Sequence, residues 1–123
     1  MQVKCGIDII EIDRIKEAIE TTKEEFINRV YTKKEIEYCE TKNNMKYQHY
    51  AARFAAKEAT FKAISEEFGK YEITWKDIEI TTNEKGRPKV EILNKEIPNL
   101  ESIDISISHC KNYAVANVTM LLK

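Results

Sequence analysis

The hydrophobic pattern of the first 22 residues predicts a strand followed by a helix. Residues 3–12 form a nearly continuous apolar run that is rich in β-branched side chains, as expected of a buried strand. From about residue 13 to residue 22 the composition becomes helical. Asp13 is the expected N-cap, because its carboxylate can accept hydrogen bonds from the free N–H groups of a first turn.

The middle of the chain predicts two further helices. Residues 33–41 follow Thr32, and Glu35 stands three residues after this threonine, which is the spacing of a capping box. Residues 45–68 form the longest periodic segment, with Gly69 as the expected stop. The apolar arc of this segment, at about 100° per residue, comprises Tyr47, Tyr50, Ala51, Phe54, Ala55, Phe61 and Ser65.

After residue 69 the pattern changes to that of strands. Residues 77–82 and 89–93 flank a turn that contains Gly and Pro, which predicts a hairpin. Three isoleucines at 103, 105 and 107 alternate with polar residues, as in a half-buried strand, and residues 113–122 are the last predicted strand. A strand, a helical block and an antiparallel set of strands together predict an α+β fold.

Length and charge exclude several classes of protein. The 123 residues fit a single domain, and a net charge of −1 argues against a broad basic surface for nucleic acid. No apolar run approaches the ~20 residues of a membrane-spanning helix, and residues 1–11 have neither the basic start nor the cleavage site of a signal peptide. Cys5, Cys39 and Cys110 are odd in number and widely spaced, which favours reduced thiols in a cytoplasmic protein.

Asp8 is an unusual residue for the apolar strand predicted at residues 3–12. An unpaired carboxylate in the middle of a core strand costs several kcal/mol. Asp8 therefore needs a cation, a set of hydrogen-bond donors or an exposed strand end. Taken alone, the residue is most simply interpreted as a carboxylate at a strand end or turn.

Glu58 and Lys62 raise a second question about buried charge. Glu58 falls between Phe54 and Phe61 inside the apolar arc, and Lys62 lies one turn further on, at the edge of the arc. An ordinary Glu–Lys pair at this spacing stabilises a helix by about 0.2–0.5 kcal/mol, but it does not explain the position beside the core. Alternatively, Asp8, Glu58 and Lys62 form a Mg²⁺ and phosphate site, since Mg²⁺ binds one or two carboxylates together with phosphate and water. Spacing alone leaves both interpretations open.

His109 and Arg87 are further candidates for binding. His109 shares the parity of the three isoleucines before it, so it should point the same way, whereas Cys110 should point to the opposite face. That geometry argues against a Cys–His nucleophile. Arg87 belongs to the predicted hairpin turn and can present a guanidinium fork to a phosphate. Because the chain has no P-loop and no G-x-G-x-x-G motif, phosphate chemistry must depend on side chains and a metal.

Six ordered stretches resemble the holo-acyl-carrier-protein synthase branch of the phosphopantetheinyl transferases. The most specific is R-F-A-A-K-E-A at 53–59, which continues to K-A at 62–63. The other stretches are G-I-D-I-I-E-I-D-R-I at 6–15, F-I-N-R-V-Y-T at 26–32 with Glu35, K-D-I-E-I at 76–80, G-R-P at 86–88, and S-I-S-H at 106–109 continuing to Tyr113 and Ala114. The resemblance spans nearly the whole chain and implies an antiparallel sheet packed against a long central helix.

The resemblance also implies a reaction. Enzymes of this family move 4′-phosphopantetheine from coenzyme A to a serine of apo-acyl-carrier protein, for fatty acid biosynthesis, and release adenosine 3′,5′-bisphosphate. They use Mg²⁺, with Mn²⁺ as an alternative, and are typically homotrimers with active sites between subunits. By analogy, Asp8 and Glu58 would hold the metal against the pyrophosphate, and Lys62 would neutralise the phosphoryl group. The serine proton would pass to Glu58 or to a water on the metal.

Two sets of binding residues follow from the same resemblance. The first would bind the phosphoadenosine end of coenzyme A: Arg53, Gly86, Arg87, Pro88 and His109. The second would receive the acidic recognition helix of the carrier protein: Arg14, Phe26, Arg29 and Phe54.

The chain departs from the family pattern after the K-A at 62–63. Members often continue with a glycine-rich segment, whereas residues 64–70 here read I-S-E-E-F-G-K. This predicts a longer helix and a stiffer exit, and family contacts with coenzyme A in this segment do not carry over.

Two rival functions remain at this point. The first is a non-catalytic metal- or nucleotide-binding module whose Glu58–Lys62 pair is structural. The second is a broader-range transferase for peptide- or polyketide-synthase carriers, although those enzymes usually have about twice this length as pseudo-dimers.

Overall fold

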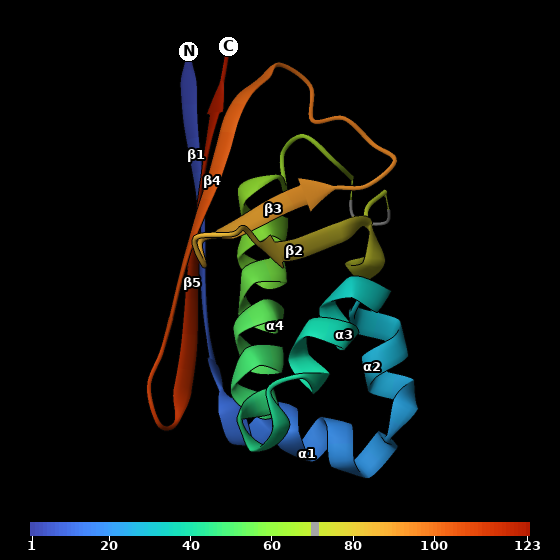
Figure 1. Cartoon of the computed structure of the whole chain (residues 1–123). Helices are drawn as coiled ribbons and strands as arrows, with labels where there is room; N and C mark the ends of the chain where they lie inside the picture. The colour runs from blue at the N-terminus through green and yellow to red at the C-terminus, as the bar shows by residue number, and fades with distance from the viewer. Residues whose placement is uncertain (70–71) are drawn as a thin grey trace.

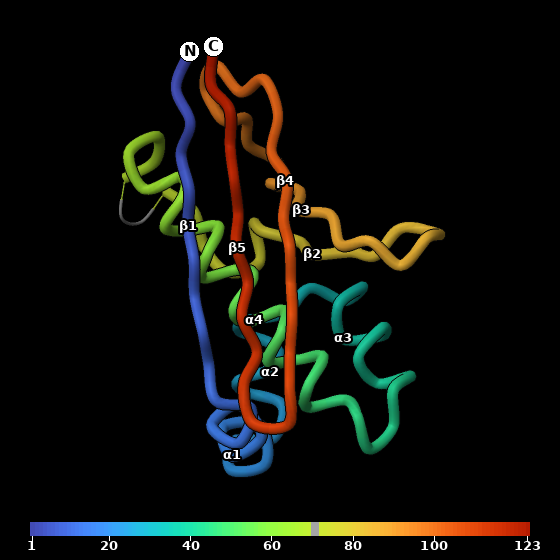
Figure 2. The backbone as a smooth tube through the Cα atoms, turned by 90° about the vertical axis from the view of Figure 1, so that its left-hand side faces the viewer, coloured from blue at the N-terminus to red at the C-terminus, as the bar shows by residue number. Residues whose placement is uncertain are grey.

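Three long strands form an antiparallel sheet in the computed structural model, which describes residues 1–69 and 72–123. β1 (Gln2–Glu11) and β4 (Leu100–His109) are its edges, and β5 (Tyr113–Leu122) lies between them. Figure 2 shows this sheet face on, with the helix α4 behind it. The two chain termini lie at the same end of the sheet (Figure 1).

The helix α4 (Lys46–Ala63) packs along the inner face of this sheet. Gly6 of β1 faces the helix so closely that a Cβ atom added there would lie 1.9 Å from the carbonyl oxygen of Ala59. Small side chains on the helix allow this approach. The buried alanines of α4 are Ala51, Ala52, Ala55, Ala56, Ala59 and Ala63.

A hairpin crosses the C-terminal half of α4 (Figure 1). It consists of β2 (Ile78–Thr82) and β3 (Pro88–Ile92), and the short 3₁₀ turn η2 (Trp75–Asp77) leads into it. Gly86 in the turn has φ of +80°, a backbone conformation that glycine adopts without steric cost. The hairpin, the sheet and α4 enclose one hydrophobic core.

Three short helices and a 3₁₀ turn surround the first half of α4. They are α1 (Ile12–Thr22), α2 (Glu24–Val30), α3 (Lys33–Glu40) and η1 (Asn43–Met45). Together with α4 they enclose a second core. None of the helices in the described parts of the chain combines the length and apolarity that a membrane crossing requires.

The α+β fold, the hairpin and the strand over 113–122 are confirmed. The capping box is also present: the Thr32 hydroxyl accepts from the backbone N–H of Glu35, and the Glu35 carboxylate accepts from that of Thr32. The helix α2 was not predicted, because its seven residues are too few to show a helical period.

The prediction of Asp13 as N-cap is wrong. Helix α1 begins at Ile12, and Glu11 in the cap position makes no side-chain cap. The N–H of Ile12 instead donates to the carbonyl of Asn112 at 2.9 Å. The turn between β4 and β5 therefore satisfies a first-turn donor that a capping side chain would otherwise serve.

The longer helix predicted up to residue 68 is also wrong. Helix α4 ends at Ala63, well before Gly69. The hydroxyl of Ser65 donates to the carbonyl of Lys62 at 2.9 Å, so a side chain takes up an acceptor at the helix end. The chain beyond the helix is tied to β1 by Lys4, which pairs with Glu66 at 2.9 Å and with Glu67 at 3.5 Å. Lys70, the last residue of the predicted stiff exit, lies outside the described residues.

Candidate active site

Asp8 and Lys62 meet beside the free edge of β1. The Lys62 Nζ atom lies 3.3 Å from Asp8 Oδ1 and donates to the carbonyl of Ile7 at 2.9 Å. Asp8 lies inside β1, opposite Ala116 of β5, so its interpretation as a strand-end or turn carboxylate is wrong. Lys62 provides the cation that a half-buried carboxylate needs.

Glu58 lies on the same side of α4, and the charges of Asp8 and Lys62 both affect the pKa of its carboxyl. Burial raises the pKa of its carboxyl above the usual range, the negative charge of Asp8 raises this pKa further, and the ammonium group of Lys62 opposes the shift. The ion pair of Lys62 is formed with Asp8 of β1 and not with Glu58. Glu58 and Lys62 therefore do not form the simple ion pair that their spacing on the helix allowed.

The two carboxylates fit a hard divalent cation. Within residues 1–69 and 72–123, no group of three or more His, Cys, Asp and Glu side chains comes together as a metal site. Asp8 and Glu58 offer two carboxylates instead. Mg²⁺ accepts this number when phosphate and water complete its octahedron. Their mutual repulsion, expressed in the raised pKa of Glu58, is what a bound cation would relieve.

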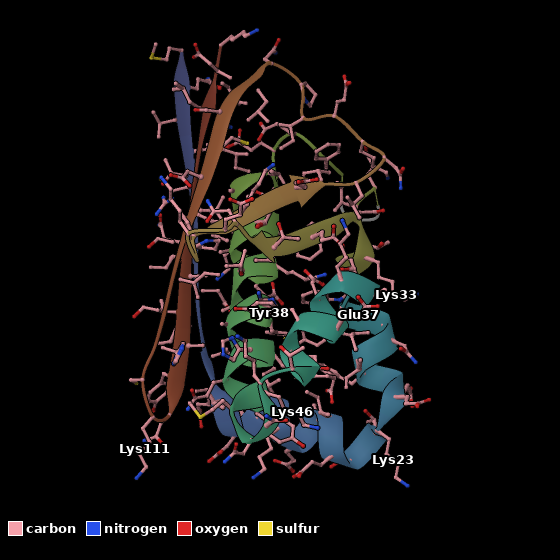
Figure 3. The ribbon with its side chains drawn as sticks, in the orientation of Figure 1. Lys23, Lys33, Glu37, Tyr38, Lys46 and Lys111 are labelled. Atoms are coloured by element: carbon pink, nitrogen blue, oxygen red, sulfur yellow. The ribbon has the colours of Figure 1, made fainter. Side chains whose placement is uncertain are left out.

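Arg53 is buried on α4 and makes contacts with two neighbouring elements. Arg53 is only 4% exposed, and its guanidinium carbon lies 4.0 Å from the ring centroid of Tyr38. Its Nη2 donates to the Thr82 hydroxyl at 3.1 Å, at the end of β2. Figure 3 labels Tyr38 where α3 faces α4. The role of Arg53 in binding coenzyme A stays a prediction.

His109, at the end of β4, lies beside a second histidine that the sequence did not single out. The rings of His109 and His49 have centroids 6.1 Å apart, and His49 also meets Tyr38 edge-on at 5.6 Å. Because His49 belongs to α4, His109 lies on the inner side of the sheet, as its parity predicted. Burial, together with the charges of Arg53 and Lys42, lowers the pKa of His49 to about 4. The sequence signal that could have identified His49 is its spacing from Arg53, four residues along the same helix.

Arg87 is placed by the hairpin against the edge of the large sheet. Its Nη2 donates to Asp104 Oδ2 of β4 at 2.8 Å, and both side chains are exposed. Gly86 provides the positive φ of the turn, and Pro88 begins β3. This contact holds the G-R-P turn beside β4, the strand that ends at His109.

A row of aromatic rings runs beside Glu58. Phe26 of α2 stacks with Phe54 of α4 at 6.1 Å, Phe54 stacks with Trp75 at 5.0 Å, and Trp75 meets Phe61 edge-on at 5.2 Å. Phe54 and Phe61 are the residues between which Glu58 falls on the helix. Phe26 and Phe54 are therefore brought together as predicted, whereas the contribution of Trp75 was missed.

The predicted carrier-binding arginines lie on the short helices. Arg14 of α1 and Arg29 of α2 are both exposed. Further lysines on this part of the surface, among them Lys23 and Lys33, point away from the helices into solvent (Figure 3). Exposed carboxylates lie among these cations, for example those of Glu24 and Glu37.

Comparison with known proteins decides the family. The family model of the 4′-phosphopantetheinyl transferase superfamily matches residues 4–118. The chain belongs to this superfamily. It is 45% identical over 127 residues to the holo-[acyl-carrier-protein] synthase of Ruminiclostridium cellulolyticum, and the alignment covers 99% of this chain and 94% of that protein. It is 47% identical over 120 residues to that of Chlamydia felis, with 95% of each covered.

Solved structures from the superfamily share the fold. A holo-(acyl-carrier-protein) synthase from Bacillus anthracis, in complex with CoA (3′,5′-ADP), has a TM-score of 0.78 and 35% identity, with 95% of this chain and 94% of that chain covered. The Helicobacter pylori enzyme, in complex with coenzyme A, has a TM-score of 0.81 and 35% identity, with 95% and 99% covered. The synthase branch that the sequence motifs predicted is confirmed.

Proposed function

We propose that this chain transfers 4′-phosphopantetheine from coenzyme A to a serine hydroxyl of an apo-acyl-carrier protein. The observation that carries the proposal is the meeting of Asp8, Glu58 and Lys62, which two separate elements bring to one place. The names of the relatives and the coenzyme A complexes of the structural neighbours support the same reaction.

The proposed step is a displacement at phosphorus. The serine oxygen forms a bond to the β-phosphorus of coenzyme A, and the bond to the oxygen of adenosine 3′,5′-bisphosphate breaks. Such a step needs positioning and neutralisation of charge more than covalent chemistry from the protein. Mg²⁺ or Mn²⁺, held by Asp8 and Glu58, would supply Lewis-acid neutralisation of the pyrophosphate.

The protein side chains have distinct tasks in this scheme. Lys62 is more than half exposed, with a side-chain exposure of 55%, so its ammonium group can turn from Asp8 toward the phosphoryl oxygens. We assign the serine proton to Glu58, because the other carboxylate of the site, Asp8, is already paired with Lys62. We assign the phosphoadenosine end to Arg53, His109 and the turn Gly86, Arg87 and Pro88.

Mass spectrometry of a candidate carrier protein tests the reaction. After incubation with coenzyme A and Mg²⁺, the carrier should gain the mass of one phosphopantetheine group. A non-catalytic module would leave the mass unchanged. A parallel incubation with a peptide-synthase carrier identifies a broader-range enzyme, which would load both carriers at similar rates. The cytoplasmic location and the single domain expected from the sequence stay predictions.

We assign carrier docking to the short helices α1 and α2, with Arg14 as a central contact. Arg14→Glu should raise the KM for the carrier protein about tenfold or more while leaving the KM for coenzyme A within about twofold, because a like charge then faces the acidic helix. Steady-state kinetics with each substrate varied in turn measure both constants. Lys123→Glu makes the same charge change at the far end of the molecule and serves as control (Figure 1). Equal effects of Arg14→Glu on both constants would contradict the docking assignment.

We also propose a homotrimer with the site between subunits. The outer face of the sheet, which no helix or strand of the described residues covers in Figure 2, carries exposed apolar side chains, with Val3, Ile7 and Ile9 exposed by 64%, 60% and 63%. A hollow of about 360 Å³ is lined by apolar residues of this face together with Asp8 and Lys62. A second copy packed on the face would therefore border the candidate active site.

Ile9→Asp tests the trimer, because a charge in the middle of an apolar interface is costly to bury. The wild type should scatter light as three copies of a 14.4 kDa chain, about 43 kDa, and the variant as one copy. Transfer activity should fall together with the mass. Asn94→Asp adds the same charge in an exposed loop and should change neither property. A wild-type protein that is already monomeric and active would exclude the trimer.

A further inference from the structure

Lys57, the residue before Glu58 on α4, is fully buried. Its ammonium group lies 2.7 Å from Glu35 Oε1 of α3. It also donates to three backbone carbonyls, at 2.7–2.8 Å. These belong to Val30, Trp75 and Ile78. One buried cation thus binds the end of α2, the turn η2, the start of β2 and the helix α3.

The partners of Lys57 are themselves satisfied by hydrogen bonds. Glu35 accepts from the backbone N–H of Thr32 at 2.8 Å and from that of Ile80 at 2.7 Å. The hydroxyl of Thr32 donates to Glu79 at 2.6 Å. All of these side chains are buried. A polar network of this completeness fixes the relative positions of the elements that it joins.

The stability of the fold does not by itself explain such a network. Well-packed apolar residues of similar volume often stabilise a protein as much as a buried ion pair does, or more. What an apolar side chain cannot provide is direction, because only a donor can select three specific carbonyl oxygens. The position of those carbonyls is therefore the feature to explain.

The carbonyls lie next to the groups that the proposed reaction uses. Val30 ends α2, the helix that carries Phe26 and Arg29. The carbonyl of Trp75 accepts from Lys57, and its ring packs against both Phe54 and Phe61. These two phenylalanines precede and follow Glu58 along α4. Lys57 therefore contacts both the end of the helix assigned to carrier docking and the residue whose ring packs beside Phe54 and Phe61.

We propose that Lys57 is a positioning residue for the carrier protein. Its ammonium group holds α2 and Trp75 at fixed positions relative to Glu58, so that the docked carrier presents its serine to the candidate site. Coenzyme A binding should depend less on this alignment, because the Gly86, Arg87 and Pro88 turn lies at the end of the hairpin opposite Ile78 and Arg87 is held by Asp104 of β4. The inference rests on the proposed transfer reaction and on carrier docking at the short helices.

The double variant E35Q/K57M tests the proposal by removing both members of the buried ion pair. Both substitutions keep the approximate shape of the side chain and remove its charge, so the chain should fold. The KM for the carrier protein should rise about tenfold, because small displacements of positioning elements are costly, whereas that for coenzyme A should stay within about twofold. Trp75 is the only tryptophan of the chain, so its fluorescence emission should shift to longer wavelength without any ligand.

The matched control is K89M/E91Q, which removes an exposed Lys–Glu pair on β3. It should change neither the emission nor either KM. A second variant, Glu35→Gln alone, leaves Lys57 its three carbonyl acceptors and should keep the carrier KM near that of the wild type.

Two outcomes would overturn the positioning role. One is a folded E35Q/K57M protein, as judged by circular dichroism, with wild-type emission and wild-type carrier KM. The other is a Glu35→Gln variant as defective for the carrier as the double variant, since the carbonyl contacts would then not be decisive. A wild type that loads no carrier refutes the proposed function instead, and the emission of Trp75 still shows whether Lys57 positions this ring.

Discussion

Glu58→Gln is expected to reduce phosphopantetheine transfer roughly thousandfold while leaving the fold intact. The substitution keeps the size of the side chain but removes one of the two carboxylates that fit a divalent cation, and it removes the proposed proton acceptor. Loss of a general base alone typically costs 10²–10⁴-fold, so roughly thousandfold is a moderate expectation. In free energy this is about 4 kcal/mol of transition-state stabilisation.

Carrier loading followed by mass spectrometry measures this effect. The control is Glu37→Gln, the same substitution on the exposed surface of α3, which should load the carrier at the wild-type rate (Figure 3). Titration of Mn²⁺ monitored by electron paramagnetic resonance gives a reading that does not depend on activity, and the variant should bind the ion more weakly. Wild-type loading by Glu58→Gln would refute both roles assigned to this carboxylate.

The candidate site was predictable where a charge conflicted with its local pattern. Asp8 interrupts an apolar strand and Glu58 interrupts an apolar helical arc, and for each residue a partner from another element was one of the interpretations left open. The structure supplies that partner, since Lys62 of α4 pairs with Asp8 of β1. The prediction of the elements themselves rested on period and turn residues, and it held for the hairpin and the last strand.

Lys57 and Arg53 were not predictable in this way. Both lie on α4, and an apolar arc assigns one side of a helix to the core and the other to solvent. Helix α4 is instead covered by the sheet, by the hairpin and by the short helices, so its polar side chains are buried as well. Which carbonyls and carboxylates receive these cations depends on elements distant in sequence, and no local spacing encodes that.

The continuous apolarity of residues 3–12 has a similar explanation. A strand with one solvated face would alternate between apolar and polar residues. In β1 the outward positions carry Val3, Ile7 and Ile9, whereas the inward positions include Gly6 and Asp8. The apolar run therefore reflects the outer face, which we assign to contacts between subunits, as much as the core.

Gly6→Ala is expected to destabilise the protein by about 3 kcal/mol and to impair transfer. An added Cβ atom would lie 1.9 Å from the carbonyl oxygen of Ala59 and 2.8 Å from the backbone nitrogen of Ala63. Both atoms belong to helix backbone, which cannot yield as a side chain can, so β1 and α4 must separate. Asp8 lies two residues further along β1, so this separation also moves its carboxylate away from Glu58 and Lys62.

Gly69→Ala is the matched control for this substitution. Among the described residues, the atoms nearest to a Cβ atom there belong to the Glu72 side chain, with Oε1 at 2.7 Å, and that side chain can move aside. Urea unfolding should show a loss of about 3 kcal/mol for Gly6→Ala and of less than about 1 kcal/mol for Gly69→Ala. A Gly6→Ala protein with wild-type stability would mean that β1 and α4 tolerate a wider spacing. Wild-type transfer by the same protein would mean that the chemistry does not need Asp8 at its present distance from Lys62.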